Sequence, residues 1–183
     1  LPESLIIVGG GVIGCEFASL YTDLGRKVTV IEALPRILAN MDKDVARNLQ
    51  MILKNRGAEI FSGAQVTKIA NDGGKACVTF ASGSEEKTVT ADKVLIATGR
   101  KSVLDAVDKV ADRLEIVRGR IVTDKNGKTS IDHIYAAGDI AEGIQLAHKA
   151  SAEGENIALV GRLFVVQGKI LETEALGQNI HED

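Results

Sequence analysis

The sequence is poor in aromatic residues and carries no excess of positive charge. It has no tryptophan, four phenylalanines and two tyrosines, and its 22 basic residues are outnumbered by 25 acidic ones. Proteins that bind nucleic acid rely on a basic surface and, for single strands, on aromatic stacking. We therefore expect no nucleic-acid partner.

Long apolar runs and clustered metal ligands are also missing. The apolar run nearest the start is Leu5–Val8, far short of the ~20 residues of a membrane-spanning helix. No basic segment followed by an apolar one suggests a signal peptide. Two cysteines, Cys15 and Cys77, make no disulfide framework or CxxC pair, and the three histidines are scattered. We expect a cytoplasmic protein with no bound metal and no membrane contact.

Glycine, in contrast, is abundant, with 19 in 183 residues, and it punctuates an α/β pattern. Leu5–Val8 and Lys27–Glu32 are typical of buried parallel strands, and Val12–Leu24 between them has a helical pattern. A second helix is predicted from Asp42 to Gly57, followed by a strand at Ala58–Phe61. The apolar face expected for this helix comprises Val45, Leu49, Ile52 and Leu53.

The apolar period then changes to two. Three short strands are predicted at 65–70, 76–81 and 87–91, joined by glycine-rich turns. The predicted fold class is α/β: a Rossmann-like parallel sheet flanked by helices, with an inserted three-stranded antiparallel β-meander. A further parallel strand is predicted at 93–97, and residues 102–118 are compatible with helix or loop. Further elements are expected as strands at 121–122 and 133–137 and a helix at 145–160.

The segment Gly9–Gly14 matches G-x-G-x-x-G between a strand and a helix, and Glu32 ends the next strand 18 residues after Gly14. In such a loop the first glycine permits the tight turn, the second lets a pyrophosphate approach the backbone, and the third lets helix and sheet pack closely. The helix N-terminus offers unpaired N–H groups to phosphates. We predict an NAD site made by Glu32 and the loop residues Gly9, Gly10, Gly11, Val12, Ile13 and Gly14.

Two alternatives stay open at this site. The loop can be a glycine-rich turn of another α/β protein, although the strand, helix and terminal acid together favour a dinucleotide. Arg36 can hold the 2′-phosphate of NADP, but Glu32 repels such a phosphate, so NAD is favoured.

Several separated segments occur in an order that points to one family. They read GGGVIGCEFA (9–18), VIEALPRIL (30–38), VLIATGR (94–100), IYAAGD (134–139) and QLAHKASAEG (145–154). Together they resemble the pyridine-nucleotide disulfide oxidoreductases, most closely the dihydrolipoamide dehydrogenase branch, over about residues 1–158. The resemblance implies an NAD-binding domain at 1–100, the C-terminal portion of an FAD-binding domain at 101–160, and an unassigned tail at 161–183.

The resemblance also implies roles for single residues. Glu16 faces the nicotinamide, Val66 lines the adenine pocket and Gly99 backs the nicotinamide side, although Glu16 also fits an exposed helix position and Val66 a plain strand position. Asp139 binds the ribityl chain of FAD. Backbone N–H groups meet the flavin at Gln145, Leu146, Ala147 and His148.

Other parts of the family pattern are absent. The sequence has no second glycine fingerprint and no close cysteine pair, and His181–Glu182 in the tail lacks the family's surrounding pattern. Cys15 and Cys77 are interpreted as isolated structural residues, although a thiol in the first helical turn can have a lowered pKa. We therefore assign no catalytic residue and expect a fragment that binds NAD, with FAD held only by the full-length parent.

In the parent, the resemblance implies electron transfer from a dithiol through a disulfide and FAD to NAD+. The fragment alone is expected to be inactive. Its expected partners are NAD(H) and the remainder of the flavoenzyme, which is expected to be a homodimer, with a 2-oxo acid dehydrogenase complex as a candidate assembly. The alternatives are an NADH-dependent flavoreductase with another acceptor and a non-catalytic nucleotide-sensing Rossmann protein.

Overall fold

The computed structural model describes residues 1–160, 163–166 and 169–171. The chain forms two compact units, Leu1–Gly99 and Arg100–Asp183, and each is described by itself. The elements of the first unit are β1 (Ser4–Val8), α1 (Val12–Asp23), β2 (Lys27–Glu32), α2 (Lys43–Asn55), β3 (Glu59–Ser62), β4 (Ala64–Asp72), β5 (Lys75–Ser82), β6 (Glu85–Ala91) and β7 (Lys93–Ile96).

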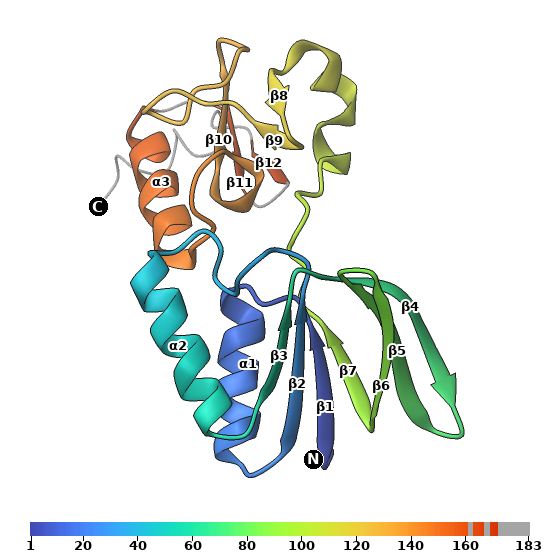
Figure 1. Cartoon of the computed structure of the whole chain (residues 1–183). Helices are drawn as coiled ribbons and strands as arrows, with labels where there is room; N and C mark the ends of the chain where they lie inside the picture. The colour runs from blue at the N-terminus through green and yellow to red at the C-terminus, as the bar shows by residue number, and fades with distance from the viewer. Residues whose placement is uncertain (161–162, 167–168, 172–183) are drawn as a thin grey trace. The chain divides into compact units, whose positions relative to one another are not determined.

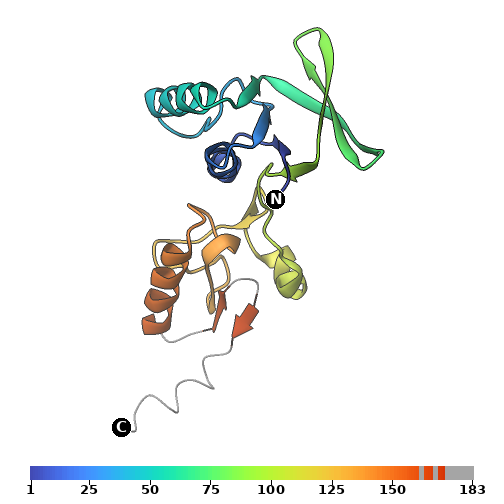
Figure 2. The ribbon, with the colours of Figure 1, turned by 90° about the horizontal axis from the view of Figure 1, so that it is seen from below.

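A parallel sheet with strand order β3-β2-β1-β7 forms the centre of the first unit. Helices α1 and α2 cover one face of this sheet, and the antiparallel sheet β4-β5-β6 lies on the other (Figures 1 and 2). The predicted fold class, including the inserted meander, is confirmed.

From Leu5 to Val8 the central strand β1 is apolar, and both of its faces are buried. Leu5 and Ile7 belong to the core beneath the helices, whereas Ile6 and Val8 belong to the core beneath the meander. This alternation follows from the two-residue repeat of a strand. In the meander core, the ring centroids of Phe61 and Phe80 are 5.0 Å apart.

The face that α2 buries matches the predicted one in part, because Leu53 is buried and Leu49 packs against the same core, but Val45 and Ile52 lie outside it. Ala46 and Leu53 are buried, while Val45 is 59% exposed and Ile52 is 37% exposed. The small side chain of Ala46 lets the helix approach the sheet on that side, so the contact stripe is rotated away from Val45. The Asp42 side chain caps the helix, because its Oδ1 accepts from Asp44 N at 2.8 Å and Val45 N at 3.2 Å.

The second unit is built from short elements. Residues 102–118, which the sequence left as helix or loop, contain a 3-10 helix and a short strand. The elements are η1 (Asp105–Arg113), β8 (Ile116–Val117), β9 (Arg120–Ile121), β10 (Ile134–Ala137), the 3-10 turn η2 (Gly138–Ile140), α3 (Ala147–Val160), β11 (Leu163–Val166) and β12 (Lys169–Leu171).

Strand β10 pairs in parallel with β11, and β11 pairs antiparallel with β12. Both β11 and β12 fall in the stretch 161–183, which the sequence left unassigned. His181 and Glu182 lie outside the described residues. Helix α3 packs on β10 through Ile157, which shares a buried cluster with Tyr135 and Ala137.

Asp92, between β6 and β7, joins the start of β1 to the meander. Its Oδ2 accepts from Glu3 N and Ser4 N, both at 2.9 Å, and from Ser4 Oγ at 3.0 Å. Its Oδ1 accepts from Lys75 Nζ at 2.6 Å. The hydrogen bond from Lys75, followed by those from Ser4, holds the pKa of Asp92 well below its usual value.

We predict that Asp92→Asn destabilises the first unit and that its effect depends on pH. Because the folded-state pKa is depressed, the stabilisation is present above the unfolded-state pKa of about 4 and is lost progressively as the pH falls below it. Urea unfolding at pH 7 and at pH 3 should show the gap between the wild type and Asp92→Asn narrowing at low pH. Asp72→Asn removes an exposed carboxylate from β4 as the control; equal pH dependence for both variants would refute the assignment.

Candidate functional site

The glycine loop, Gly9–Gly14, connects β1 to α1 at the carboxyl end of the parallel sheet. Gly9 has φ +107°, and a Cβ there would lie 2.4 Å from the carbonyl oxygen of Ala97, which follows β7. A Cβ at Gly14 would lie 1.9 Å from the carbonyl oxygen of Gly9. Loop, helix and neighbouring strand are therefore in direct backbone contact at these two positions.

Gly11 is different, because a Cβ there would meet no protein atom within 4 Å. Gly11 is the N-cap of α1, with φ −73° and ψ −171°, a conformation open to any residue, and no side chain caps the helix. The next residues, Val12 and Ile13, are exposed. The helix N-terminus thus faces open space, as an anion-binding helix start requires.

Gly10 has a role that the sequence pattern did not indicate. A Cβ there would lie 2.8 Å from Ile37 Cγ2 and 3.1 Å from Glu32 Oε2. The carbonyl oxygen of Gly10 accepts from Leu38 N at 2.8 Å. The loop after β2 therefore lies directly against the glycine loop, and only glycine fits between them.

Glu32, the last residue of β2, holds these two loops together. Its Oε2 accepts a short hydrogen bond from Gly10 N, and its Oε1 accepts from Leu34 N at 2.7 Å. A carboxylate has about four acceptor positions, so each oxygen of this half-buried side chain can accept one more hydrogen bond. This is the capacity needed to bind a pair of ribose hydroxyls.

Arg36 is half-buried and bonded within its own loop. Its Nη2 donates to the carbonyl oxygens of Ala39 at 2.7 Å and Met41 at 3.0 Å. The guanidinium thus stabilises the loop that follows β2. This structural task uses Nη2, whereas the buried Nη1 of Arg36 has no hydrogen-bond partner among the described residues.

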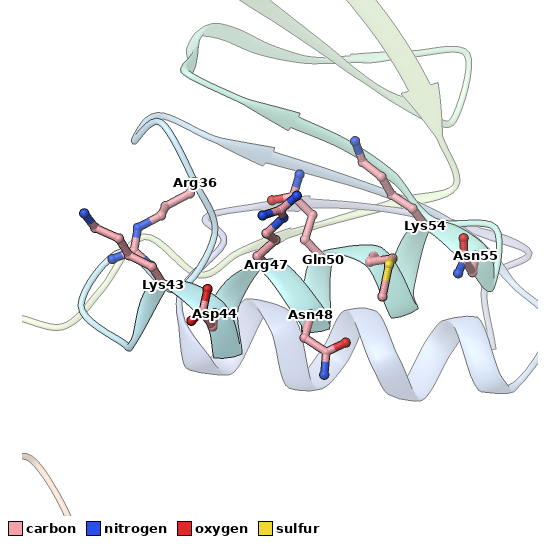
Figure 3. Close-up of a pocket in the computed structure, with 9 residues that line it drawn as sticks. Arg36, Lys43, Asp44, Arg47, Asn48, Gln50, Lys54 and Asn55 are labelled. Atoms are coloured by element: carbon pink, nitrogen blue, oxygen red, sulfur yellow. The ribbon is translucent and has the colours of Figure 1, made fainter.

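A separate groove of about 700 Å³ runs along the outer face of α2 (Figure 3). No residue of the glycine loop lines it. The lining includes Arg36, Lys43, Arg47 and Lys54 together with one acid, Asp44. Such a charged lining is typical of a helix face in contact with water.

The other residues predicted for the first unit lie at separate places. Glu16 is exposed on α1. Val66, on β4, is half-buried and packs against the meander core, at an irregularity in the pairing of β4 with β5. Gly99, with φ +116°, lies two residues after Ala97, the residue that contacts Gly9.

Cys15 lies beneath the glycine loop rather than in an exposed reactive position. It is 4% exposed, and its Sγ donates to the carbonyl oxygen of Gly10 at 3.4 Å. Burial, aided by the negative charge of Glu32, raises the pKa of the Cys15 thiol to about 11. The alternative of a lowered pKa at the helix start is therefore wrong, because desolvation outweighs the helix dipole. Cys77 is a free thiol on β5, in the other sheet.

We predict that a disulfide reagent at pH 8 modifies Cys77 and leaves Cys15 unmodified in the folded chain. Thiolate is the reacting species, and Cys15 is both buried and protonated at that pH. Peptide mass spectrometry after brief labelling identifies the modified residue, and labelling in urea, where both thiols react, is the control. Modification of both cysteines at similar rates under native conditions would contradict this result.

In the second unit, the structure brings the two predicted flavin-binding segments together. Asp139 lies in η2, and a Cβ at the preceding Gly138 would lie 3.2 Å from the Cβ of Ala150 in α3. Gly138 N donates to Glu153 Oε2 at 2.9 Å. Helix α3 begins directly after Gln145 and Leu146, with Ala147 and an exposed His148 in its first turn.

The Asp139 carboxylate forms an ion pair with Arg100, with Oδ2 and Nη2 3.6 Å apart. Ser102 Oγ donates to the carbonyl oxygen of Asp139 at 2.8 Å. Both partners come from the first residues of the second unit.

Two further properties concern the described residues alone. Within them, no group of three or more histidine, cysteine, aspartate or glutamate side chains is arranged to hold a metal ion. No helix in the same part of the chain has both the length and the apolar character needed to cross a membrane.

The family assignment comes from comparison with known proteins. The model of the pyridine nucleotide-disulphide oxidoreductase family matches residues 1–154. The chain belongs to this family. A dihydrolipoyl dehydrogenase of Bacillus subtilis (strain 168) is 38% identical over 161 residues, covering 84% of this chain and 33% of the relative. The predicted family is confirmed, and the predicted resemblance to its dihydrolipoamide dehydrogenase branch agrees with this relative.

Solved structures of this oxidoreductase family agree with the fold. The HOCl-induced flavoprotein disulfide reductase RclA from Escherichia coli has a TM-score of 0.75 at 33% identity, covering 86% of this chain and 35% of the other. The water-forming NADH oxidase from Lactobacillus brevis, bound to NADH, has a TM-score of 0.77 at 21% identity, covering 86% and 36%; at that identity the likeness concerns the fold. The chain therefore spans about a third of the length of its relatives.

Proposed function

We propose that the first unit binds NAD(H) and is the NAD-binding part of a dihydrolipoyl dehydrogenase-like flavoenzyme. The observation that carries this proposal is the geometry at Gly11. Gly11 is the N-cap residue of α1, no side chain caps this helix end, and no protein atom lies within 4 Å of the position of a Cβ. In the same loop, the Cβ positions of Gly9 and Gly14 are blocked by backbone atoms. A dinucleotide pyrophosphate needs this combination of close backbone approach and free N–H groups.

Glu32 supports NAD rather than NADP as the ligand. Its two oxygens retain acceptor capacity for the adenine ribose hydroxyls, and its charge opposes a 2′-phosphate. Arg36, the basic residue nearest to Glu32 in sequence, donates through Nη2 to carbonyl oxygens of its own loop, which leaves its buried Nη1 without a partner among the described residues. NAD supplies a hydride acceptor when bound, while the chain's own residues bind and orient it.

Three further residues are assigned to the NAD half of the active site. Glu16, exposed one turn into α1, is proposed to face the nicotinamide, with Gly99 backing that side, and Val66 is proposed to line the adenine end. Residues 100–160 are proposed as the returning portion of the FAD-binding domain. In it, Asp139 meets the ribityl chain and the backbone at residues 145–148 meets the flavin.

The chain is proposed to be inactive alone, as a part of a longer polypeptide. Its two cysteines are free and lie in different parts of the first unit, so the described residues offer no dithiol for exchange. The remainder of the polypeptide is proposed to supply the redox disulfide and the rest of the FAD site. The complete enzyme is proposed to be a homodimer that passes electrons from a dithiol to NAD+, with a 2-oxo acid dehydrogenase complex as its candidate assembly.

A titration of the 183-residue chain with NADH tests the proposal directly. We expect binding by the wild type and at least ~10-fold weaker binding by Gly11→Ala, because the added Cβ occupies the space of the pyrophosphate. Gly154→Ala is the matched control, since a Cβ there also meets no atom within 4 Å. Equal affinities for Gly11→Ala and Gly154→Ala, or no binding by the wild type, would refute the assignment.

A related flavoreductase with another electron acceptor is the second candidate. The 33% identity with the flavoprotein disulfide reductase RclA from Escherichia coli favours it, because that relative is not named as a dihydrolipoyl dehydrogenase. Activity of the protein expressed from the complete reading frame separates the two. NAD+ reduction with dihydrolipoamide supports the first candidate, and NADH consumption with oxygen but without dihydrolipoamide activity supports the second.

A further inference from the structure

The groove on the outer face of α2, here called the α2 groove, is bounded by two rows of side chains at helical spacing. The first row is cationic and consists of Lys43, Arg47, Gln50 and Lys54. Its successive members are four, three and four residues apart, so they lie above one another along the helix. With a rise of about 1.5 Å per residue, the row extends for about 16 Å from Lys43 to Lys54.

The second row gives the groove its other wall and carries little charge. It consists, at the same intervals, of Asp44, Asn48, Met51 and Asn55. Figure 3 shows the side chains of Arg47 and Lys54 extending to one side of α2 and that of Asn48 to the other. Two neighbouring rows with a groove between them form the surface into which a ridge of a second helix packs. The shape of the α2 groove therefore favours a helical occupant.

The charge of the first row is not balanced by this chain. Lys43, Arg47 and Lys54 are exposed, and none of them forms an ion pair within the part of the chain that the structure describes. A helix face that only contacts water usually alternates charges of both signs, whereas like charges four residues apart, such as Lys43 and Arg47, weaken a helix. This positive surplus belongs to a chain whose net charge is −3, and it favours an acidic occupant.

Arg36 extends the positive charge beyond the first turn of α2. It lines the same groove, and its Nη2 is held by the carbonyl oxygens of Ala39 and Met41 at 2.7 and 3.0 Å. Met51, in the second row, is 55% exposed and offers an apolar contact. An occupant that fits these residues carries a row of carboxylates beside a small apolar surface.

We propose that the α2 groove is a docking site for an acidic amphipathic helix of a partner protein. Carboxylates of the partner at intervals of four, three and four residues meet the cationic row, and a neighbouring apolar side chain covers Met51. A contact with one face of one helix falls below the ~1,200 Å² of a stable interface, so it is transient and weakens with salt. No residue of the glycine loop lines the groove, and the inference therefore does not depend on NAD binding.

A small phosphate compound fits these observations less well. Small ligands bind in concave pockets that enclose most of their surface, whereas the α2 groove lies along the outer face of a single helix (Figure 3). The regular spacing of both rows is also a property that a second helix can match and a small anion cannot.

A synthetic peptide tests this docking site on the 183-residue chain. The spaced peptide, of about 15 residues, is rich in alanine and carries glutamates at intervals of four, three and four beside a row of leucines. The control peptide has the same composition with its glutamates distributed around the helix. Fluorescence anisotropy gives the affinities, and circular dichroism gives the helix content. We expect the spaced peptide to bind at least ~10-fold more tightly than the control peptide and to gain helix on binding.

Neutralising two cations of the first row locates the binding. We expect Arg47→Gln/Lys54→Gln to weaken binding of the spaced peptide about 10-fold, because two charge pairs are lost. Lys68→Gln/Lys93→Gln removes the same charge from exposed positions on β4 and β7 and serves as the control. Arg47→Lys/Lys54→Arg keeps both charges and is expected to retain the affinity.

Several outcomes would overturn the inference. Equal affinities of the two peptides, or equal effects of the two neutralised variants, would show attraction by net charge alone. Binding without a gain of helix would exclude a helical occupant. Displacement of the spaced peptide by an equimolar amount of inorganic tripolyphosphate would assign the groove to a small polyanion. Self-association of the wild-type chain that Arg47→Gln/Lys54→Gln abolishes would assign it to a second copy.

Discussion

Gly14→Ala is expected to lower the free energy of unfolding of the first unit by about 3 kcal/mol, the upper range for an overpacked core position. The added Cβ would lie 1.9 Å from the carbonyl oxygen of Gly9 and 3.3 Å from Ile7 Cγ2. The first of these neighbours is backbone, so relief requires α1 to move away from β1. Urea unfolding followed by circular dichroism measures the loss.

Gly11→Ala provides the matched control within the same loop. Its φ of −73° suits alanine and its Cβ meets no atom within 4 Å, so its stability is expected to stay within about 0.5 kcal/mol of the wild type. The pair separates the two uses of glycine here, since we expect Gly14 to be needed for folding and propose that Gly11 is needed for NADH binding. An equal loss of stability in both variants would show that the loop does not have the geometry described.

Glu32→Ala is expected to weaken NADH binding roughly 10- to 100-fold, or about 1.4–2.8 kcal/mol, because ribose hydroxyl acceptors are lost from a partly buried position. NADPH binding is expected to fall less, since the substitution also removes a charge that opposes the 2′-phosphate. Discrimination between the two cofactors should therefore decrease. Titrations of the wild type and of Glu32→Ala with NADH and with NADPH, followed by nicotinamide fluorescence, give the affinities.

Part of this effect comes through the protein itself. The Glu32 carboxylate also accepts from Gly10 N and Leu34 N, so its removal loosens both loops. Glu59→Ala removes the same charge from an exposed position on β3 and serves as the control. Tighter binding of NADPH than of NADH by the wild type, or equal effects of the two substitutions, would contradict the role given to Glu32.

Most of the first unit was predictable from local patterns. The β1–α1–β2 unit, the meander and the parallel strand β7 follow from apolar periodicity and glycine-marked turns, which depend on neighbouring residues. The face of α2 was not predictable in the same way. Val45 and Ala46 are both apolar, and only the close approach permitted by Ala46 decides which of them faces the sheet.

The candidate site also has one part that the sequence could predict and one part that it could not. The position of the glycine loop and its acid could be inferred because the spacing of G-x-G-x-x-G and Glu32 is a property of the chain. The contacts of Gly10 with Ile37 and of Arg36 with its own loop could not, because they depend on how the segment after β2 folds back. The raised pKa of Cys15 likewise depends on burial rather than on position in a helix.

The sequence by itself determined the family, the order of the strands and helices in the first unit, and the place of the glycine loop, because short-range periodicity and motif spacing carry that information. Only the tertiary structure decided which glycines are held by backbone contact and which one faces open space. It also decided that α1 buries its small residues and exposes Ile13, Phe17, Leu20 and Leu24. Burial depends on which surfaces meet across the fold, and residue order along one helix does not contain that information.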